Sequence, residues 1–157
     1  MIYTKEPANQ FYVYLTAYRA VETNEVNEKM LKGMIAEIRK YPGLYGVIES
    51  TNHTGCFREA GQDAASTERT LCVRARDAVE AAQLTDLACL SYDQDAVLVV
   101  NSQTHTSALW SVEQIGEYPN QFPALRETPL NGTFQMVDAP SGECYTLDDG
   151  GYCWEVI

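Results

Sequence analysis

Two helical segments, each lying between short apolar segments, constrain the fold of this chain more than any other feature of its sequence. In residues 24–41, apolar side chains recur at steps of three and four, with lysines and glutamates between them. This spacing predicts an amphipathic helix with one buried stripe, and Asn24 is a suitable N-cap. The helix is expected to end at residues 41–43, because Pro42 cannot continue it. Residues 78–92 are rich in alanine and leucine and predict a second helix, with Asp77 as its N-cap.

Four segments around these helices predict strands. Residues 11–18 are dense in aromatic and β-branched side chains, and residues 44–50 resume an apolar pattern after the first helix. Residues 70–75 alternate polar and apolar side chains. Residues 96–100 form a continuous apolar run, typical of a buried central strand, and lead into a polar extension at residues 102–106. The predicted order of elements is therefore βαββαβ.

This order is that of a ferredoxin-like sandwich, an α+β fold in which right-handed crossovers place both helices on one face of an antiparallel sheet. The opposite face then lacks a cover, and self-association is a common way to provide one. We therefore expect a homotrimer packed through its sheets. Residues 116–157 predict short C-terminal β-hairpins, one of them around the turn at residues 148–151. No repeat or linker divides the chain, so residues 1–157 are expected to form one domain.

The charge of the chain argues against two classes of partner. Eleven lysines and arginines against 22 aspartates and glutamates give a formal net charge of −11, which repels phosphate backbones and anionic lipid. We therefore expect neither nucleic-acid nor membrane binding. No apolar run approaches the roughly 20 residues of a membrane span, and the first ten residues are polar where a signal peptide is apolar. A cytoplasmic location follows as an expectation.

Cysteine and histidine usage gives no sign of a metal site. The five cysteines lack a C-x-x-C pair, and only two histidines are present, His53 and His105. We expect reduced thiols, with Cys72 and Cys89 buried as small hydrophobic side chains. The sequence also lacks a P-loop, a dinucleotide-binding glycine turn, a nucleophile elbow and a zinc-protease motif. We therefore expect no metal and no cofactor.

Residues 51–67 lose hydrophobic periodicity and predict a long polar loop, a feature that often carries function. Glu59 and Glu68 lie in or beside this loop, Phe57 lies within it, and a hydroxyl-rich run follows the fourth predicted strand. In an oligomer such a loop can reach the next subunit, which allows a site between subunits. The residues alone favour the simpler interpretation, in which they form a solvated loop and a polar strand end without a site.

Four motifs in the same order favour the functional interpretation. They are residues 4–9 with 11–13, residues 43–46 with 49–51, residues 54–56 with 58–60, and residues 97–99 with 102–106. Together they resemble the phage S-adenosylmethionine hydrolase or lyase family over about the first two thirds of the chain. The resemblance implies degradation of S-adenosylmethionine, by which a phage counters host restriction and modification.

The resemblance leaves the reaction type open. A hydrolase gives homoserine and methylthioadenosine, whereas a lyase gives homoserine lactone and methylthioadenosine. The lyase chemistry is simpler, because the substrate carboxylate closes a five-membered ring and the sulfonium leaves as a neutral thioether. The main task of the enzyme is then to hold the methionine chain in a folded conformation, and well-oriented intramolecular attack is worth roughly 7–11 kcal/mol. Aromatic cavity walls suit both the adenine ring and the sulfonium.

The resemblance also implies roles for individual residues. Glu68 is the catalytic acidic residue, which holds the substrate ammonium in a lyase or acts as general base in a hydrolase. The family pattern has tyrosine at the position of Phe57, so this chain keeps the ring, lacks the hydroxyl and is expected to turn over slowly. The residues expected to bind substrate are Glu59, Ser50, Thr51, Gln103, Thr104 and His105.

Two other functions fit parts of the sequence. Trimeric ferredoxin-like proteins include sensors that bind adenine nucleotides at subunit clefts. An acidic protein can also mimic DNA and block nucleases, but the carboxylates of this chain are dispersed among predicted helices and loops. Enzyme activity is the leading prediction, and the sensor is the main alternative.

Overall fold

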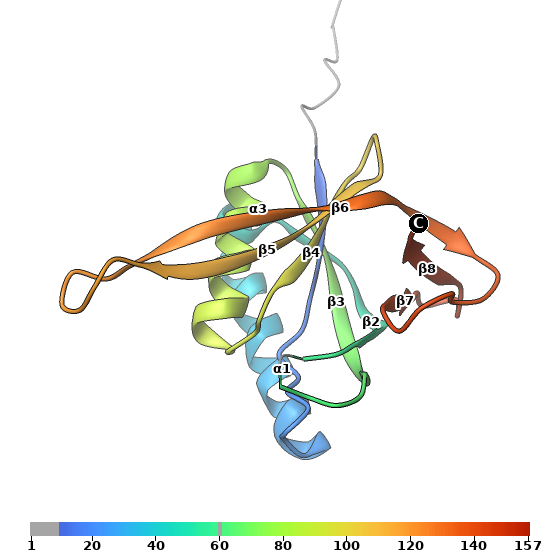
Figure 1. The fold of residues 1–157 in the computed structure, drawn as a ribbon, viewed down its shortest axis with the longest axis horizontal. Helices are drawn as coiled ribbons and strands as arrows, with labels where there is room; N and C mark the ends of the chain where they lie inside the picture. The colour runs from blue at the N-terminus through green and yellow to red at the C-terminus, as the bar shows by residue number, and fades with distance from the viewer. Residues whose placement is uncertain (1–9, 60) are drawn as a thin grey trace, which may run out of the picture.

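Over residues 10–59 and 61–157, which the computed structural model describes, the chain folds into a closed barrel of eight antiparallel strands (Figure 1). The strand order around the barrel is β1-β3-β2-β7-β8-β6-β5-β4, and β4 pairs in turn with β1. The strands are β1 (Phe11–Leu15), β2 (Val47–Phe57), β3 (Ser66–Ala75), β4 (Val97–Asn101), β5 (Thr106–Ile115), β6 (Phe122–Val137), β7 (Tyr145–Leu147) and β8 (Cys153–Val156).

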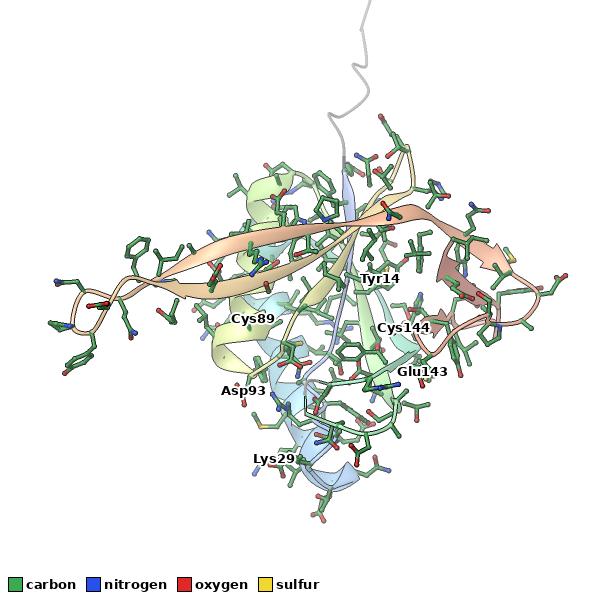
Figure 2. The ribbon with its side chains drawn as sticks, in the orientation of Figure 1. Tyr14, Lys29, Cys89, Asp93, Glu143 and Cys144 are labelled. Carbon is green, nitrogen blue, oxygen red and sulfur yellow. The ribbon has the colours of Figure 1, made fainter. Side chains whose placement is uncertain are left out.

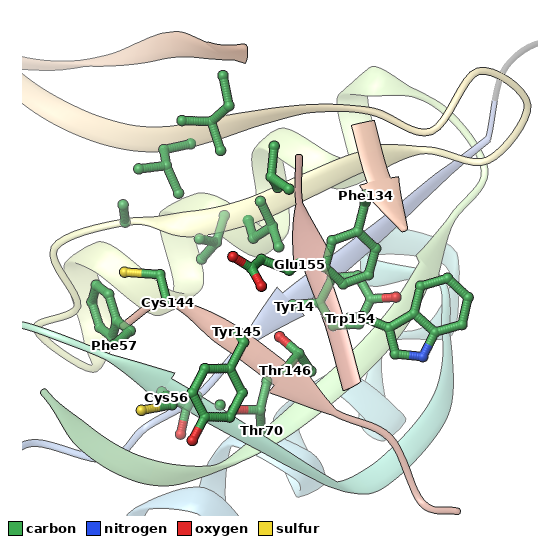
Figure 3. Close-up of a pocket in the computed structure, with 18 of the residues that line it drawn as sticks. Tyr14, Cys56, Phe57, Thr70, Phe134, Cys144, Tyr145, Thr146, Trp154 and Glu155 are labelled. Carbon is green, nitrogen blue, oxygen red and sulfur yellow. The ribbon is translucent and has the colours of Figure 1, made fainter. Parts of the chain in front are cut away.

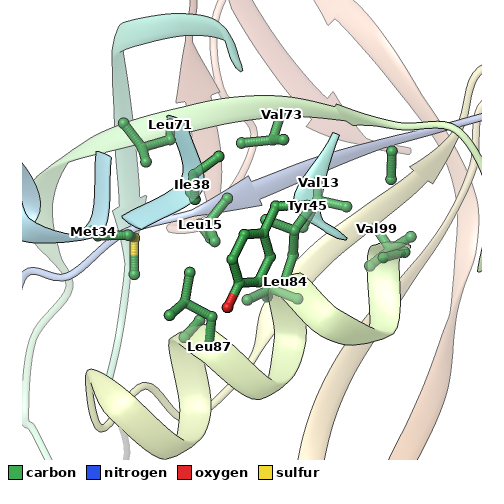
Figure 4. Packing of buried hydrophobic residues seen from close by; sticks show 14 of the residues in the cluster. Val13, Leu15, Met34, Ile38, Tyr45, Leu71, Val73, Leu84, Leu87 and Val99 are labelled. Atoms are coloured by element: carbon green, nitrogen blue, oxygen red, sulfur yellow. The ribbon is translucent and has the colours of Figure 1, made fainter. Parts of the chain in front are cut away.

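The helices lie together on one side of the barrel. They are α1 (Asn24–Lys40), the short α2 (Pro42–Tyr45), α3 (Ala78–Asp86) and the π-helical turn η1 (Leu87–Ser91). Their buried side chains meet the outward-facing side chains of β1, β3 and β4 in the main hydrophobic core (Figure 4). Members of this core include Val13, Leu15, Leu31, Met34, Ile38, Leu71, Val73, Leu84 and Val99.

Alternation along β1 shows how one strand serves both the core and the barrel interior. Val13 and Leu15 are fully buried among the helices. Tyr14 points to the opposite face, because successive side chains of a strand alternate, and its ring contacts Phe134 of β6. The inner face of the sheet is therefore covered by the chain's own later strands.

The expected ferredoxin-like sandwich is wrong. The sheet formed by the first four strands does not stay open, because β2 pairs with β7 and β4 pairs with β5. The C-terminal third, expected to form separate hairpins, supplies β6, β7 and β8 and closes the barrel. The predicted bare sheet face faces the barrel interior, which removes the physical reason given for packing a homotrimer through the sheets.

The boundaries of the first elements also differ from those predicted. The N-cap of α1 is Thr23, whose side chain accepts a hydrogen bond from the Val26 amide, and not Asn24. Pro42 begins the short helix α2, where its missing N–H costs nothing. The second predicted helix is divided into α3 and η1, and its predicted N-cap, Asp77, is confirmed by its bond to the Glu80 amide at 2.9 Å.

The predicted loop at residues 51–67 is mostly strand. β2 runs as far as Phe57 and β3 begins at Ser66, so the two long strands form one antiparallel hairpin. Register shifts near Ser50 interrupt the pairing. At this irregularity Ser50 donates to Asp149 at 2.6 Å, and His53 lies 3.0 Å from the same carboxylate. These contacts attach the β7–β8 turn to β2.

Candidate functional site

The strands of the barrel line a cavity of about 600 Å³, a size typical of small-molecule sites. Its walls come from strands distant in sequence, and Figure 3 shows aromatic side chains of β1, β2, β6, β7 and β8 around it. Trp154 stacks on Phe134 with 5.6 Å between ring centroids, and Phe134 contacts Tyr14 at 5.2 Å. The described residues lining the cavity include Tyr14, Cys56, Phe57, Glu68, Thr70, Phe134, Cys144, Tyr145, Trp154 and Glu155.

The charged residues among the described cavity walls are all acidic: Glu68, Glu143 and Glu155. Glu143 forms an ion pair with Arg58, and both side chains are largely exposed. Figure 2 places Glu143 and the neighbouring Cys144 near β7, on the side of the barrel opposite Cys89. An apolar, aromatic cavity with acidic groups is suited to a flat ring carrying a positive charge.

Glu68 on β3 is the most perturbed of these carboxyl groups. Burial, and then the charge of Glu59, raises its pKa to about 8. Gly55 on β2 lies directly across the strand pair from Glu68. A carboxyl group with such a pKa in a cavity is typical of a functional site, because its charge changes easily near neutral pH.

Comparison with known proteins decides between the functions considered for such a cavity. Residues 13–157 match the S-adenosylmethionine lyase family. The chain belongs to this family. An S-adenosylmethionine lyase of Enterobacteria phage T3 is 42% identical over 158 residues, which cover 99% of each chain. The family resemblance of the sequence motifs is thereby confirmed, and it extends through the C-terminal third.

Two of the predicted site residues of this S-adenosylmethionine lyase family member lie together at the cavity. Phe57 at the end of β2 and Glu68 on β3 both line it. Glu59 is buried but does not line the cavity; it pairs with Arg19 at 3.2 Å and accepts a hydrogen bond from the Ala20 amide. Its contacts are therefore structural, although its charge acts on Glu68.

The other predicted site residues lie outside the cavity of the same chain. Ser50 is bound to Asp149, and the Thr51 carbonyl accepts a hydrogen bond from Arg69. Gln103 and Thr104 form the turn after β4, where their amides donate to Asn101. His105 lines a smaller cavity of about 100 Å³ behind Tyr14 and Phe134.

Sequence reasoning missed the contribution of the C-terminal strands. Tyr145, Trp154 and Glu155 come from β7 and β8, which are short strands with no motif of their own. Only the closure of the barrel brings them to the cavity that Glu68 lines. Two motif segments, residues 4–9 and residue 60, lie outside the described residues.

The described residues contain no helix long and apolar enough to cross a membrane. In the same residues, no three histidine, cysteine, aspartate or glutamate side chains are grouped to hold a metal ion. All five cysteines are described and free; Cys72 is buried, whereas Cys89 is only half-buried.

Proposed function

We propose that this protein degrades S-adenosylmethionine to methylthioadenosine and homoserine lactone. Membership of the S-adenosylmethionine lyase family supports the substrate class. The observation that carries the proposal is the barrel cavity, whose described walls are aromatic and whose charged groups are carboxylates. S-adenosylmethionine is a cation with a flat ring and two positive centres, so the cavity matches its charge and shape.

The proposed reaction needs no water and no external base. One carboxylate oxygen of the substrate attacks the carbon next to sulfur, and the carbon–sulfur bond breaks with its electron pair moving to sulfur. The products are a five-membered lactone that keeps the ammonium and a neutral thioether. The enzyme accelerates this step mainly by holding the reacting atoms close together.

Glu68 is the residue we propose to hold the substrate ammonium. The ionised carboxylate is required for this role, so binding of the cation has to lower the pKa of Glu68 that burial raises. The aromatic group formed by Tyr14, Phe134 and Trp154 contributes ring faces for the adenine or the sulfonium. Phe57 lines the same cavity without a hydroxyl, which supports slow turnover.

The decisive experiment asks whether an oxygen atom from water enters the product. The protein is incubated with S-adenosylmethionine in water enriched in heavy oxygen, and products are identified by mass spectrometry from the earliest times. Early unlabelled homoserine lactone supports the lyase. Homoserine carrying heavy oxygen from the first turnover, with no lactone before it, would establish hydrolysis instead.

A control assay keeps the sensor alternative testable. Absence of any product, with binding detected by calorimetry, would contradict an active enzyme. Repeating the assay with Phe57→Tyr then separates a disabled lyase from a binding protein, because only the former regains turnover.

We also propose that the active form is a homotrimer with sites between subunits. The support now comes from the β5–β6 hairpin, which extends away from the barrel in Figure 1 and exposes large apolar side chains. These are Ile115, Tyr118, Phe122 and Leu125. Gln103, Thr104 and His105 lie away from the cavity of their own chain, so a role in binding would require a neighbouring subunit.

Sedimentation of the intact protein tests this assembly. A trimer that dissociates in Phe122→Glu, with parallel loss of activity, supports shared sites. A monomer with full activity would contradict them. Action in the cytoplasm of the infected cell, without binding to nucleic acid or membranes, remains part of the proposal and agrees with the net charge of −11.

A further inference from the structure

Glu155 is a cavity carboxylate without a cationic partner. It lies on β8, lines the cavity and is only 7% exposed. Among the described residues, no lysine or arginine forms an ion pair with it, whereas Glu143 has Arg58 and Glu59 has Arg19. Burial of an uncompensated charge is costly, so its presence requires a local explanation.

The explanation is a set of fixed hydrogen-bond donors. The Ser141 amide donates to Oε2 of Glu155 at 2.8 Å, and the Ser141 hydroxyl donates to Oε1. These bonds, led by that of the Ser141 side chain, lower the pKa of Glu155. Glu155 is therefore held ionised, in a fixed orientation, on the cavity wall.

Glu68 has the opposite electrostatic state in the same cavity. Its pKa is raised to about 8, so at neutral pH most Glu68 side chains are neutral whereas Glu155 is negative. Figure 3 shows the Glu155 carboxyl group directed into the space between the strands that carry Phe57 and Phe134. Glu155 is thus a permanent negative charge of the cavity that, unlike Glu143, has no described arginine beside it in an ion pair.

We infer that Glu155 recognises the positive sulfonium of S-adenosylmethionine and distinguishes it from the neutral thioether of the product. This inference rests on the proposed function. Substrate and methylthioadenosine share the adenosine group, but only the substrate carries charge at sulfur. A fixed carboxylate therefore strengthens binding of the substrate over that of the product, which promotes release of the product after each turnover.

The inference predicts that loss of the Glu155 carboxylate affects KM but does not lower kcat. The sulfonium charge declines as the carbon–sulfur bond breaks, so Glu155 stabilises the bound substrate more than the transition state. Loss of such an interaction raises KM without lowering kcat. A residue needed only for folding would lower kcat and weaken both ligands.

The test is Glu155→Gln in the intact protein, with kinetics for S-adenosylmethionine and competitive inhibition by methylthioadenosine. We expect KM to rise about tenfold or more, kcat to stay equal or increase, and the inhibition constant of methylthioadenosine to change less than twofold. Glu22→Gln, at an exposed position between β1 and α1, is the matched control for net charge.

Two outcomes would overturn the inference. Equal weakening of both ligands would show that Glu155 binds the shared ribose hydroxyls, and an unchanged KM would show that it does not contact the substrate. If Glu155→Gln fails to fold, Ser141→Ala keeps the carboxylate and removes its hydroxyl donor; a severalfold rise in KM alone is expected, and no change in KM would contradict the inference. Absence of product from the wild-type protein would instead contradict the proposed function.

Discussion

Gly55 on β2 and Glu68 on β3 face each other across the strand pair, and the space above Gly55 is filled by the side chains of β3. A Cβ atom at residue 55 would lie 2.6 Å from Oγ1 of Thr70 and 3.3 Å from Cγ of Glu68. Glycine at this position therefore lets the Glu68 side chain lie close to the strand.

Gly55→Ala is expected to displace Glu68 and to lower kcat/KM on the order of ten- to a hundredfold, because small misplacements of reacting groups are costly. The assay is initial-rate formation of methylthioadenosine. Gly43→Ala is the matched control, since an added Cβ there meets no atom within 4 Å. Equal activity of the two variants would show that the position of Glu68 does not matter.

The pKa of Glu68 predicts the pH dependence of activity. Burial and the nearby charge of Glu59 raise this pKa to about 8 in the free protein, and kcat/KM reports ionisations of the free enzyme. We expect kcat/KM to increase with pH and to level off above about pH 8. A profile that is flat between pH 6 and pH 9 would exclude ionised Glu68 from substrate binding.

The same ionisation predicts a cost in stability. Because the pKa of Glu68 is higher in the folded than in the unfolded protein, the folded state holds its proton more tightly and loses stability as pH rises from about 4.5 to about 8. Glu68→Gln removes this loss. We expect the variant to exceed wild type in unfolding free energy by several kcal/mol, at most about 5 kcal/mol, at pH 9, with little difference at pH 4.5.

Denaturant unfolding at the two pH values measures this difference. Asp77→Ala, which removes the N-cap of α3, is the reference variant. It should lower the free energy of unfolding by about 1 kcal/mol at both pH values. A destabilised Glu68→Gln protein at pH 9 would mean that the carboxylate supports the fold.

Phe57→Tyr restores a hydroxyl at the cavity wall. We expect kcat to rise about tenfold or more with little change in KM, in the range of a single added hydrogen-bond donor that acts in the transition state. Steady-state kinetics of both proteins measure the effect. Equal kcat values would show that a hydroxyl at residue 57 takes no part in the reaction.

The sequence predicted the two main helices because their apolar stripes repeat with helical spacing. It did not predict β5, and it predicted only residues 134–137 of β6, because prolines at residues 123 and 129 and scattered polar residues hid the rest of that strand. Trp110 is buried where β5 pairs with β4, and the alternation around it was the available signal.

The site was predicted only in part, for a related reason. Phe57 and Glu68 came from motifs near each other in sequence, and β2–β3 pairing keeps them close. Glu155 is far from both along the chain and reaches the cavity only through the closed barrel. A residue whose position depends on the last pairing of a sheet leaves no local pattern to recognise.

The strand that completes the barrel, β8, is the last of the eight described strands in chain order, and it supplies Trp154 and Glu155 to the cavity. During synthesis on the ribosome, the cavity therefore cannot exist until β8 has emerged and paired with β6 and β7. A nascent chain would leave S-adenosylmethionine untouched, and premature termination before residue 153 would yield an inactive fragment, however well the helices had folded.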